Sequence, residues 1–174
     1  MNRNSELNSS TQSKRKIPWL LLTTGVAAAA LVALIILPSS PTMSAEDADI
    51  VVYKTATCGC CSQWIEHLRH SGLGVSVVNV PDTQAVRSRV GVPRRLGSCH
   101  TAVIGDYWVE GHVPADLIQR LMTEKPKDIR GIAAPGMPAG SPGMEGPNPV
   151  RYDVLAYGSD GNTTIYATRQ GLTR

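Results

Sequence analysis

The stretch that decides the fold is residues 50–68, IVVYKTATCGCCSQWIEHL. It opens with a short apolar, β-branched run at 50–53, which is typical of a buried strand. The cysteine-rich segment 58–61 follows, and from Trp64 onward apolar residues recur at helical spacing as far as a stop signal at Gly72. The sequence therefore predicts a strand, a turn and a helix, with the cysteines at the start of the helix.

The pattern downstream extends this unit to a single α/β domain. Residues 75–80 alternate as a second strand does, and Asp82 can cap a helix over about 83–90. A hairpin is predicted for 101–111, and Pro114 opens a third helix. The resulting order, β-α-β-α-β-β-α, is that of a thioredoxin-like fold. The first unit is similar to that of a glutaredoxin, in which an apolar strand leads to Cys-x-x-Cys at a helix start.

The C-terminal part has a different composition. Residues 131–145 are so rich in Gly and Pro that we expect a loop without regular structure, and this loop carries Met137 and Met144. The segments 152–157 and 164–168 flank an Asp-Gly turn and predict a final β-hairpin, which can add strands to the sheet.

The N-terminal part predicts export. Residues 1–16 are expected to form a disordered cytoplasmic tail that ends in a basic cluster, and residues 17–37 form an apolar run of 21 residues. That run is long enough to be a signal anchor in the inner membrane, but the linker 38–48 also offers a small-residue cleavage site. The domain 49–174 is therefore expected either at the periplasmic side of the inner membrane or, after cleavage, free in the periplasm.

The charge distribution argues against a nucleic-acid partner. Four of the 17 Lys and Arg residues and one of the 14 Asp and Glu residues precede the apolar run, which leaves 13 of each sign beyond it. The exported part is formally neutral and lacks the excess of positive charge that is typical of nucleic-acid-binding proteins.

The main candidates for a functional site are the four cysteines, Cys58, Cys60, Cys61 and Cys99. Export would bring the cysteines to a compartment in which disulfides persist. Adjacent cysteines such as Cys60 and Cys61 are, however, poorly placed to bridge each other, so two structural disulfides are the less favoured interpretation. A helix N-terminus lowers thiol pKa values, and Gly59 lets the backbone bend, so three thiolates can converge from one turn. Sulfur ligands fit Cu(I) and also Zn(II), and export favours copper.

Cys99 lies just before the third predicted strand, opposite the Cys-x-x-Cys turn in a glutaredoxin-like order, where a cis-proline usually stands. Together with His100 it would bring two further ligands to face the first three cysteines. We name His100, His112, Met137 and Met144 as secondary metal ligands or site-lining residues. The ordinary alternative for His112 is a turn residue, and for the two methionines it is loop packing.

Four ordered motifs resemble the CopG-like copper-resistance family, a domain of unknown function, DUF411. The motifs are residues 57–61 with Trp64, 98–102, 110–115 and 135–145. The resemblance implies a thioredoxin-like fold in the periplasm, copper bound by the cysteines, including as a multinuclear Cu(I)–thiolate cluster, and a role in copper resistance alongside other periplasmic copper-handling proteins. It also implies a role in changing the redox state of copper.

Two functions of different classes follow. In the first, the domain is an exported binding protein that holds Cu(I) through its four cysteines and contributes to copper resistance and homeostasis. In the second, it is an oxidoreductase of copper or of protein thiols, acting through Cys58 and Cys61. We favour metal binding over an enzyme, because clustered thiolates alone are enough for it.

Overall fold

The computed structural model describes residues 48–173. The predicted tail and apolar run, and almost all of the predicted linker, lie outside the described residues. Within the described part of the chain, no helix is both long enough and apolar enough to cross a membrane.

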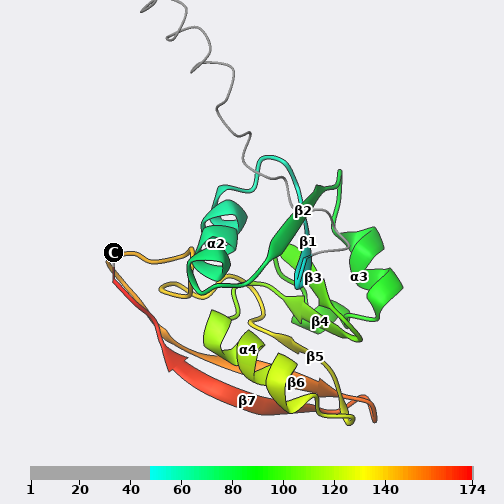
Figure 1. The fold of residues 1–174 in the computed structure, drawn as a ribbon. Coiled ribbons are helices and arrows are strands. Elements are labelled where there is room, and N and C mark those ends of the chain that lie inside the picture. The colour runs from blue at the N-terminus through cyan, green and yellow to red at the C-terminus, as the bar shows by residue number, and fades with distance from the viewer. Residues whose placement is uncertain (1–47, 174) are drawn as a thin grey trace, which may run out of the picture. The chain divides into compact units, whose positions relative to one another are not determined.

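The described chain forms a seven-stranded mixed sheet that carries helices (Figure 1). In chain order the elements are β1 (Ile50–Lys54), α2 (Gly59–His70), β2 (Val75–Asn79), α3 (Gln84–Val90), a 3-10 turn (Arg94–Leu96), β3 (His100–Ile104), β4 (Tyr107–Glu110), α4 (Ala115–Glu124), β5 (Ile129–Ala133), β6 (Arg151–Gly158) and β7 (Thr163–Gln170). The strand order is β2-β1-β3-β4-β5-β6-β7. The pairs β1–β2 and β4–β5 are parallel, and the other pairs are antiparallel. The predicted α/β class and the predicted element order as far as α4 are confirmed.

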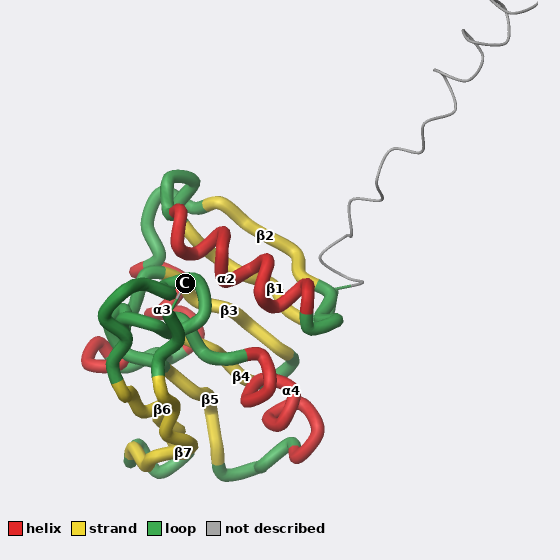
Figure 2. The backbone as a smooth tube through the Cα atoms, turned by 90° about the vertical axis from the view of Figure 1, so that its left-hand side faces the viewer, coloured by secondary structure: helices red, strands yellow, loops and turns green. Residues whose placement is uncertain are grey.

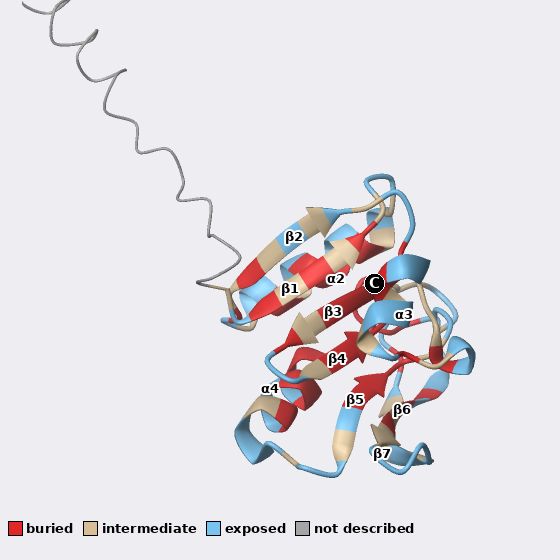
Figure 3. Ribbon diagram, turned by 90° about the vertical axis from the view of Figure 1, so that its right-hand side faces the viewer, coloured by how far each residue is buried: buried red, intermediate tan, exposed pale blue. Residues whose placement is uncertain are grey.

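Helices cover both faces of the sheet. Helices α2 and α4 lie on one face and α3 lies on the other (Figure 2). Helix α2 buries Cys61, Trp64, Ile65 and Leu68, whose spacing of three and four residues places them on one side of the helix. Burial is concentrated in the central strands, whereas the edge strands β2 and β7 carry exposed residues (Figure 3).

The prediction of an irregular loop over 131–145 is wrong for its first three residues, which belong to β5. This strand pairs with β4 on one side and with β6 on the other, so it lies inside the sheet. Gly131 is required there because a Cβ atom would overlap the ring of Trp108 on β4. The glycine that suggested a loop thus allows an aromatic side chain to pack over the neighbouring strand.

The predicted C-terminal hairpin is confirmed, and both of its strands are longer than expected. Its turn contains Gly161 at φ 82°, and the N–H of Gly158 donates to the carbonyl of Asn162 at 2.9 Å. Because β5 joins β4 to β6, the hairpin continues the main sheet, which is therefore larger than the four strands of the predicted β-α-β-α-β-β-α order.

Candidate metal centre

The N-terminal end of α2 and the segment before β3 bring the four cysteines together. The sulfur atoms of Cys58, Cys60, Cys61 and Cys99 all lie within 4.8 Å of one another. Cys58, the N-cap of α2, forms a disulfide with Cys61, and their Cα atoms are 5.4 Å apart. Cys60 and Cys99 are free. The four sulfurs therefore meet as one bridge and two thiols, and the bridge joins the pair that the oxidoreductase interpretation requires.

The position of Cys99 follows from the sheet. Strand β3 pairs with β1, so the residue before β3 lies beside the turn that follows β1. The sulfur of Cys61 is 3.8 Å from the carbonyl oxygen of Cys99, and the sulfur of Cys60 is 3.6 Å from that of Cys58. The structure thus places Cys99 opposite the Cys-x-x-Cys turn, as the glutaredoxin-like order predicts.

Two buried histidines flank Cys99. Nε2 of His112 lies 3.0 Å from the Cys99 sulfur, and Nδ1 of His100 lies 3.3 Å from it. The two rings meet edge to face with 5.0 Å between their centroids, and the His100 ring also packs on Trp64 at 4.2 Å. Both histidines are fully buried. Cys99, His100 and His112 therefore form a second group of candidate ligands beside the cysteine cluster.

The loop after β5 orients His112. Its Nδ1 is 2.8 Å from the carbonyl of Pro142, and that oxygen can only accept, so Nδ1 carries the proton. Nε2 is then left with a lone pair directed towards Cys99, and burial lowers the pKa of His112, so the ring is neutral at neutral pH. Metal-binding imidazoles are commonly oriented in this way, by a hydrogen bond from the ring nitrogen that faces away from the metal to a backbone carbonyl. Sequence reasoning missed Pro142, because a backbone carbonyl has no residue-type signal.

Cys99 and its two neighbouring histidines are uncharged at neutral pH. Burial lowers the pKa of His100 to about 3, and the neighbouring His112 adds to this effect. Nε2 of His100 has no hydrogen-bond partner among residues 48–173. Burial also raises the pKa of the Cys99 thiol to about 12, with a further contribution from Cys60. A thiophilic cation binding here would therefore displace a proton from Cys99.

A buried carboxyl group holds the backbone that carries Cys99. One carboxyl oxygen of Glu110 accepts the Ser98 N–H at 2.6 Å, and the other accepts the Thr101 hydroxyl at 2.6 Å. Nε of Arg87 lies 3.8 Å from the first oxygen, and burial raises the pKa of Glu110. Sequence reasoning gave Glu110 no role, because its position at the end of a hairpin strand does not distinguish it from a solvated polar residue.

The Gly/Pro/Met loop packs on the first turn of α2. Gly143 has φ 81°, and a Cβ atom there would come within 2.8 Å of the carbonyl of Cys60. Met144, next to it, is half-buried, whereas Met137 is 54% exposed. The loop therefore borders the cysteine cluster, and the role of the two methionines as ligands stays a prediction.

The other two histidines lie on α2. His70 is exposed and contacts the carbonyl of Glu66. His67 is half-buried, and its Nε2 accepts the N–H of Ala115 at 3.1 Å, so it helps to join α2 to the start of α4. Neither belongs to the two ligand groups.

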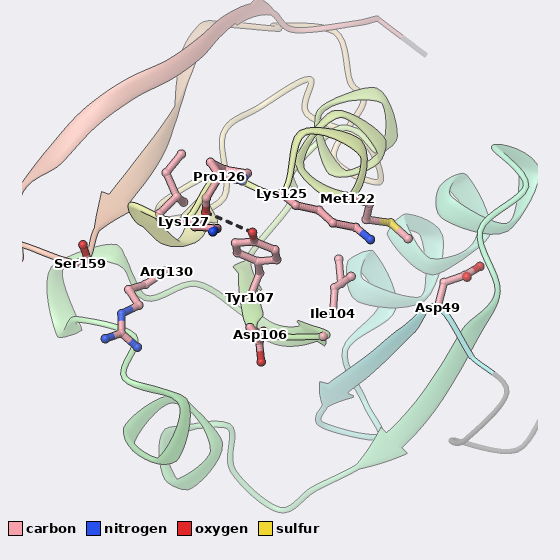
Figure 4. Close-up of a pocket in the computed structure, with 12 residues that line it drawn as sticks. Asp49, Ile104, Asp106, Tyr107, Met122, Lys125, Pro126, Lys127, Arg130 and Ser159 are labelled. Carbon is pink, nitrogen blue, oxygen red and sulfur yellow. Dashed lines mark hydrogen bonds between the residues drawn. The ribbon is translucent and has the colours of Figure 1, made fainter.

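A cavity of about 920 Å³ lies at the far end of the β3–β4 hairpin (Figure 4). Lys125, Lys127 and Arg130 contribute to its lining, and the Tyr107 hydroxyl donates to the carbonyl of Pro126 at 3.1 Å. Its lining contains none of the cysteines or histidines. This cavity is therefore separate from the candidate metal centre.

Comparisons with known proteins agree with the motif resemblance. Residues 96–144 match the family model described as "Protein of unknown function, DUF411". Two solved structures of a copper resistance protein CopG are similar. Form 2 is 45% identical, with a TM-score of 0.65, and the alignment covers 69% of this chain and 96% of that chain. Form 1 is 46% identical, with a TM-score of 0.65, and the coverage is 70% and 97%. The search of curated proteins finds no match. This identity over nearly the whole solved chain shows that the protein belongs to the CopG-like DUF411 family.

Proposed function

We propose that the protein binds copper, holding Cu(I) through the thiolates of Cys58, Cys60, Cys61 and Cys99, and that it contributes to copper resistance. The observation that carries this proposal is the convergence of the four sulfurs within 4.8 Å of one another. Thiolates are soft ligands that suit Cu(I), and the two similar structures are of a copper resistance protein.

Copper binding by all four sulfurs requires the Cys58–Cys61 bridge to be opened first. Reduction adds two electrons and two protons and yields two thiols, which join Cys60 and Cys99. Thiolates can bridge metal ions, so four of them in this space suit a multinuclear Cu(I) cluster. The nitrogens of His100 and His112 adjoin Cys99 as further ligands. Zn(II) is the competing ion for the same donor set.

The fold and location are part of the same proposal. The strand order β2-β1-β3-β4, with α2 and α4 on one face and α3 on the other, supports a thioredoxin-like core within the domain 49–174. Strands β5, β6 and β7 extend the sheet of this core. We place this domain in the periplasm, exported by the apolar run 17–37 acting as an anchor or a cleaved signal. Other copper-handling proteins of the periplasm are its expected partners.

A second candidate function is thiol–disulfide or copper oxidoreduction. It is favoured by the Cys58–Cys61 bridge at the N-terminus of α2, where the sulfur of Cys60 lies only 3.6 Å from that of Cys58. In this function the reduced pair would transfer two electrons and two protons to a disulfide substrate, or one electron to each of two Cu(II) ions with release of two protons, and would itself become bridged. Rapid reduction of a disulfide peptide in the presence of a Cu(I) chelator would favour this alternative.

The test of the binding proposal is an anaerobic Cu(I) titration of the reduced protein, in competition with a colorimetric Cu(I) chelator. Saturation at a definite ratio of copper to protein is expected, and a ratio above one would indicate a cluster. A variant with Cys60, Cys61 and Cys99 changed to Ser should lose this binding, whereas Ser62→Ala, at an exposed position in the same helix turn, should keep it. Failure of the reduced protein to saturate, or tighter binding of Zn(II) than of Cu(I), would contradict the proposal.

A further inference from the structure

A buried lysine lies at the turn that leads into the cysteine cluster. Lys54 is the last residue of β1 and is only 4% exposed. Its Nζ donates to the carbonyl of Thr55 at 2.9 Å, and the same carbonyl accepts the N–H of Cys58 at 3.2 Å. The shared acceptor keeps the ammonium group at the turn that carries the first cysteine.

The sheet also places Lys54 beside the second cysteine-bearing segment. Lys54 is paired with His100 across β1 and β3, and directly opposed residues project from the same face of a sheet. After burial and His112, the charge of Lys54 is a further cause of the lowered pKa of His100. Lys54 therefore lies between the two segments that supply the four sulfurs.

No carboxylate among residues 48–173 forms an ion pair with this lysine. The ion pairs among residues 48–173 are Arg69–Glu66, Arg87–Glu110, Arg120–Glu124 and Arg169–Asp116. A cation taken largely out of water without a counter-charge lowers the stability of the fold, so buried lysines are usually paired. Cys58, at the same turn, and Cys99, beside His100, can become anionic when they bind Cu(I).

We propose that Lys54 provides the counter-charge of the thiolate site and favours the first Cu(I) that binds. The inference rests on the proposed function, since it needs the cysteines to bind Cu(I). Each thiol loses its proton as it binds Cu(I), so a first Cu(I) held by two thiolates has a net charge of −1, whereas a site with as many Cu(I) ions as thiolates is neutral. Attraction to Lys54 therefore favours the first, anionic complex and is weakest in the fully loaded one.

This role predicts effects of opposite sign on stability and on binding. Lys54→Met keeps an unbranched side chain but removes the charge, so the reduced protein without copper should be as stable in urea as the wild type, or more stable. Its first Cu(I) should bind roughly ten- to hundredfold more weakly, and later ions should be affected less. Lys54→Arg keeps the charge and should bind within a few-fold of the wild type.

The test uses the full, reduced chain under anaerobic conditions, with chelator competition for successive Cu(I) ions and urea unfolding of each variant without copper. Lys127→Met is the matched control, since it makes the same charge change at an exposed position in the cavity of Figure 4 and should leave Cu(I) affinity unchanged. If the wild type binds Cu(I) and Lys54→Met binds its first ion equally well, this inference is wrong and the proposed function stands. If Lys54→Met weakens the binding of every Cu(I) ion equally and also lowers the stability of the copper-free protein, Lys54 has a structural role and the inference is overturned. Absence of Cu(I) binding by the wild type would overturn both.

Discussion

Replacement of Glu110 by Ala should sharply destabilise the fold. The change leaves the Ser98 N–H and the Thr101 hydroxyl without their 2.6 Å partners and removes the carboxyl group nearest to Arg87. An unsatisfied buried donor costs about 1–3 kcal/mol, and breaking a buried ion pair costs about 3–5 kcal/mol. Because these contributions overlap, we expect the free energy of unfolding to fall by about 3–5 kcal/mol.

Urea unfolding followed by tryptophan fluorescence measures this loss. The control is Glu66→Ala, because the Glu66 side chain is 57% exposed and its ion pair with Arg69 lies on the surface. Exposed pairs contribute about 0–1 kcal/mol, so the control should remain close to the wild type. A loss below about 1 kcal/mol for Glu110→Ala would refute the view that this carboxyl group holds the Cys99 segment.

Glu110 should also make stability depend on pH. Burial raises its pKa in the folded protein above its ordinary value of 4.5, so between the ordinary and the folded pKa the folded state binds more protons than the unfolded state. The contribution of Glu110 to the free energy of unfolding is therefore fully present below pH 4.5 and is lost as the pH rises through its pKa in the folded protein. Glu110→Gln does not titrate, so its stability relative to the wild type should increase over that rise in pH. Urea unfolding of both proteins from acid to neutral pH measures this difference, and parallel pH profiles would contradict the assignment.

Three further predictions concern the core and the thiols. Gly131→Val should destabilise the sheet by more than about 3 kcal/mol, because its side chain must displace the Trp108 ring, and loss of near-ultraviolet circular dichroism would report this change. Trp64→Phe removes the 2.8 Å bond to the carbonyl of Val113 and should cost about 1–3 kcal/mol in thermal or urea unfolding. Alkylation of the unfolded protein should label two of its four cysteines before reduction and all four afterwards, and four labels before reduction would show that the bridge is absent.

Local patterns were enough to predict much of the fold. The β-branched run at 50–53, the helical spacing after Trp64 and the Asp-Gly turn each reflect interactions between residues close in sequence, and the elements that they predict are present. Strand β5 was missed because Gly131 has a packing reason that composition does not show. The spacing of Cys58, Cys60 and Cys61 alone predicted that these three sulfurs would lie near one another.

The sequence by itself thus determined which residue types are available for metal chemistry and which of them share one helix turn. Only the tertiary structure decided how the site is completed. It set the 3.0 Å approach of His112 Nε2 to the Cys99 sulfur, oriented the imidazole with the carbonyl of Pro142, and placed Glu110 against the backbone of Ser98 and Lys54 opposite His100. These contacts join residues far apart in the chain, and they depend on strand pairing and on backbone atoms that every residue type shares. For that reason no local pattern of side chains could have revealed them.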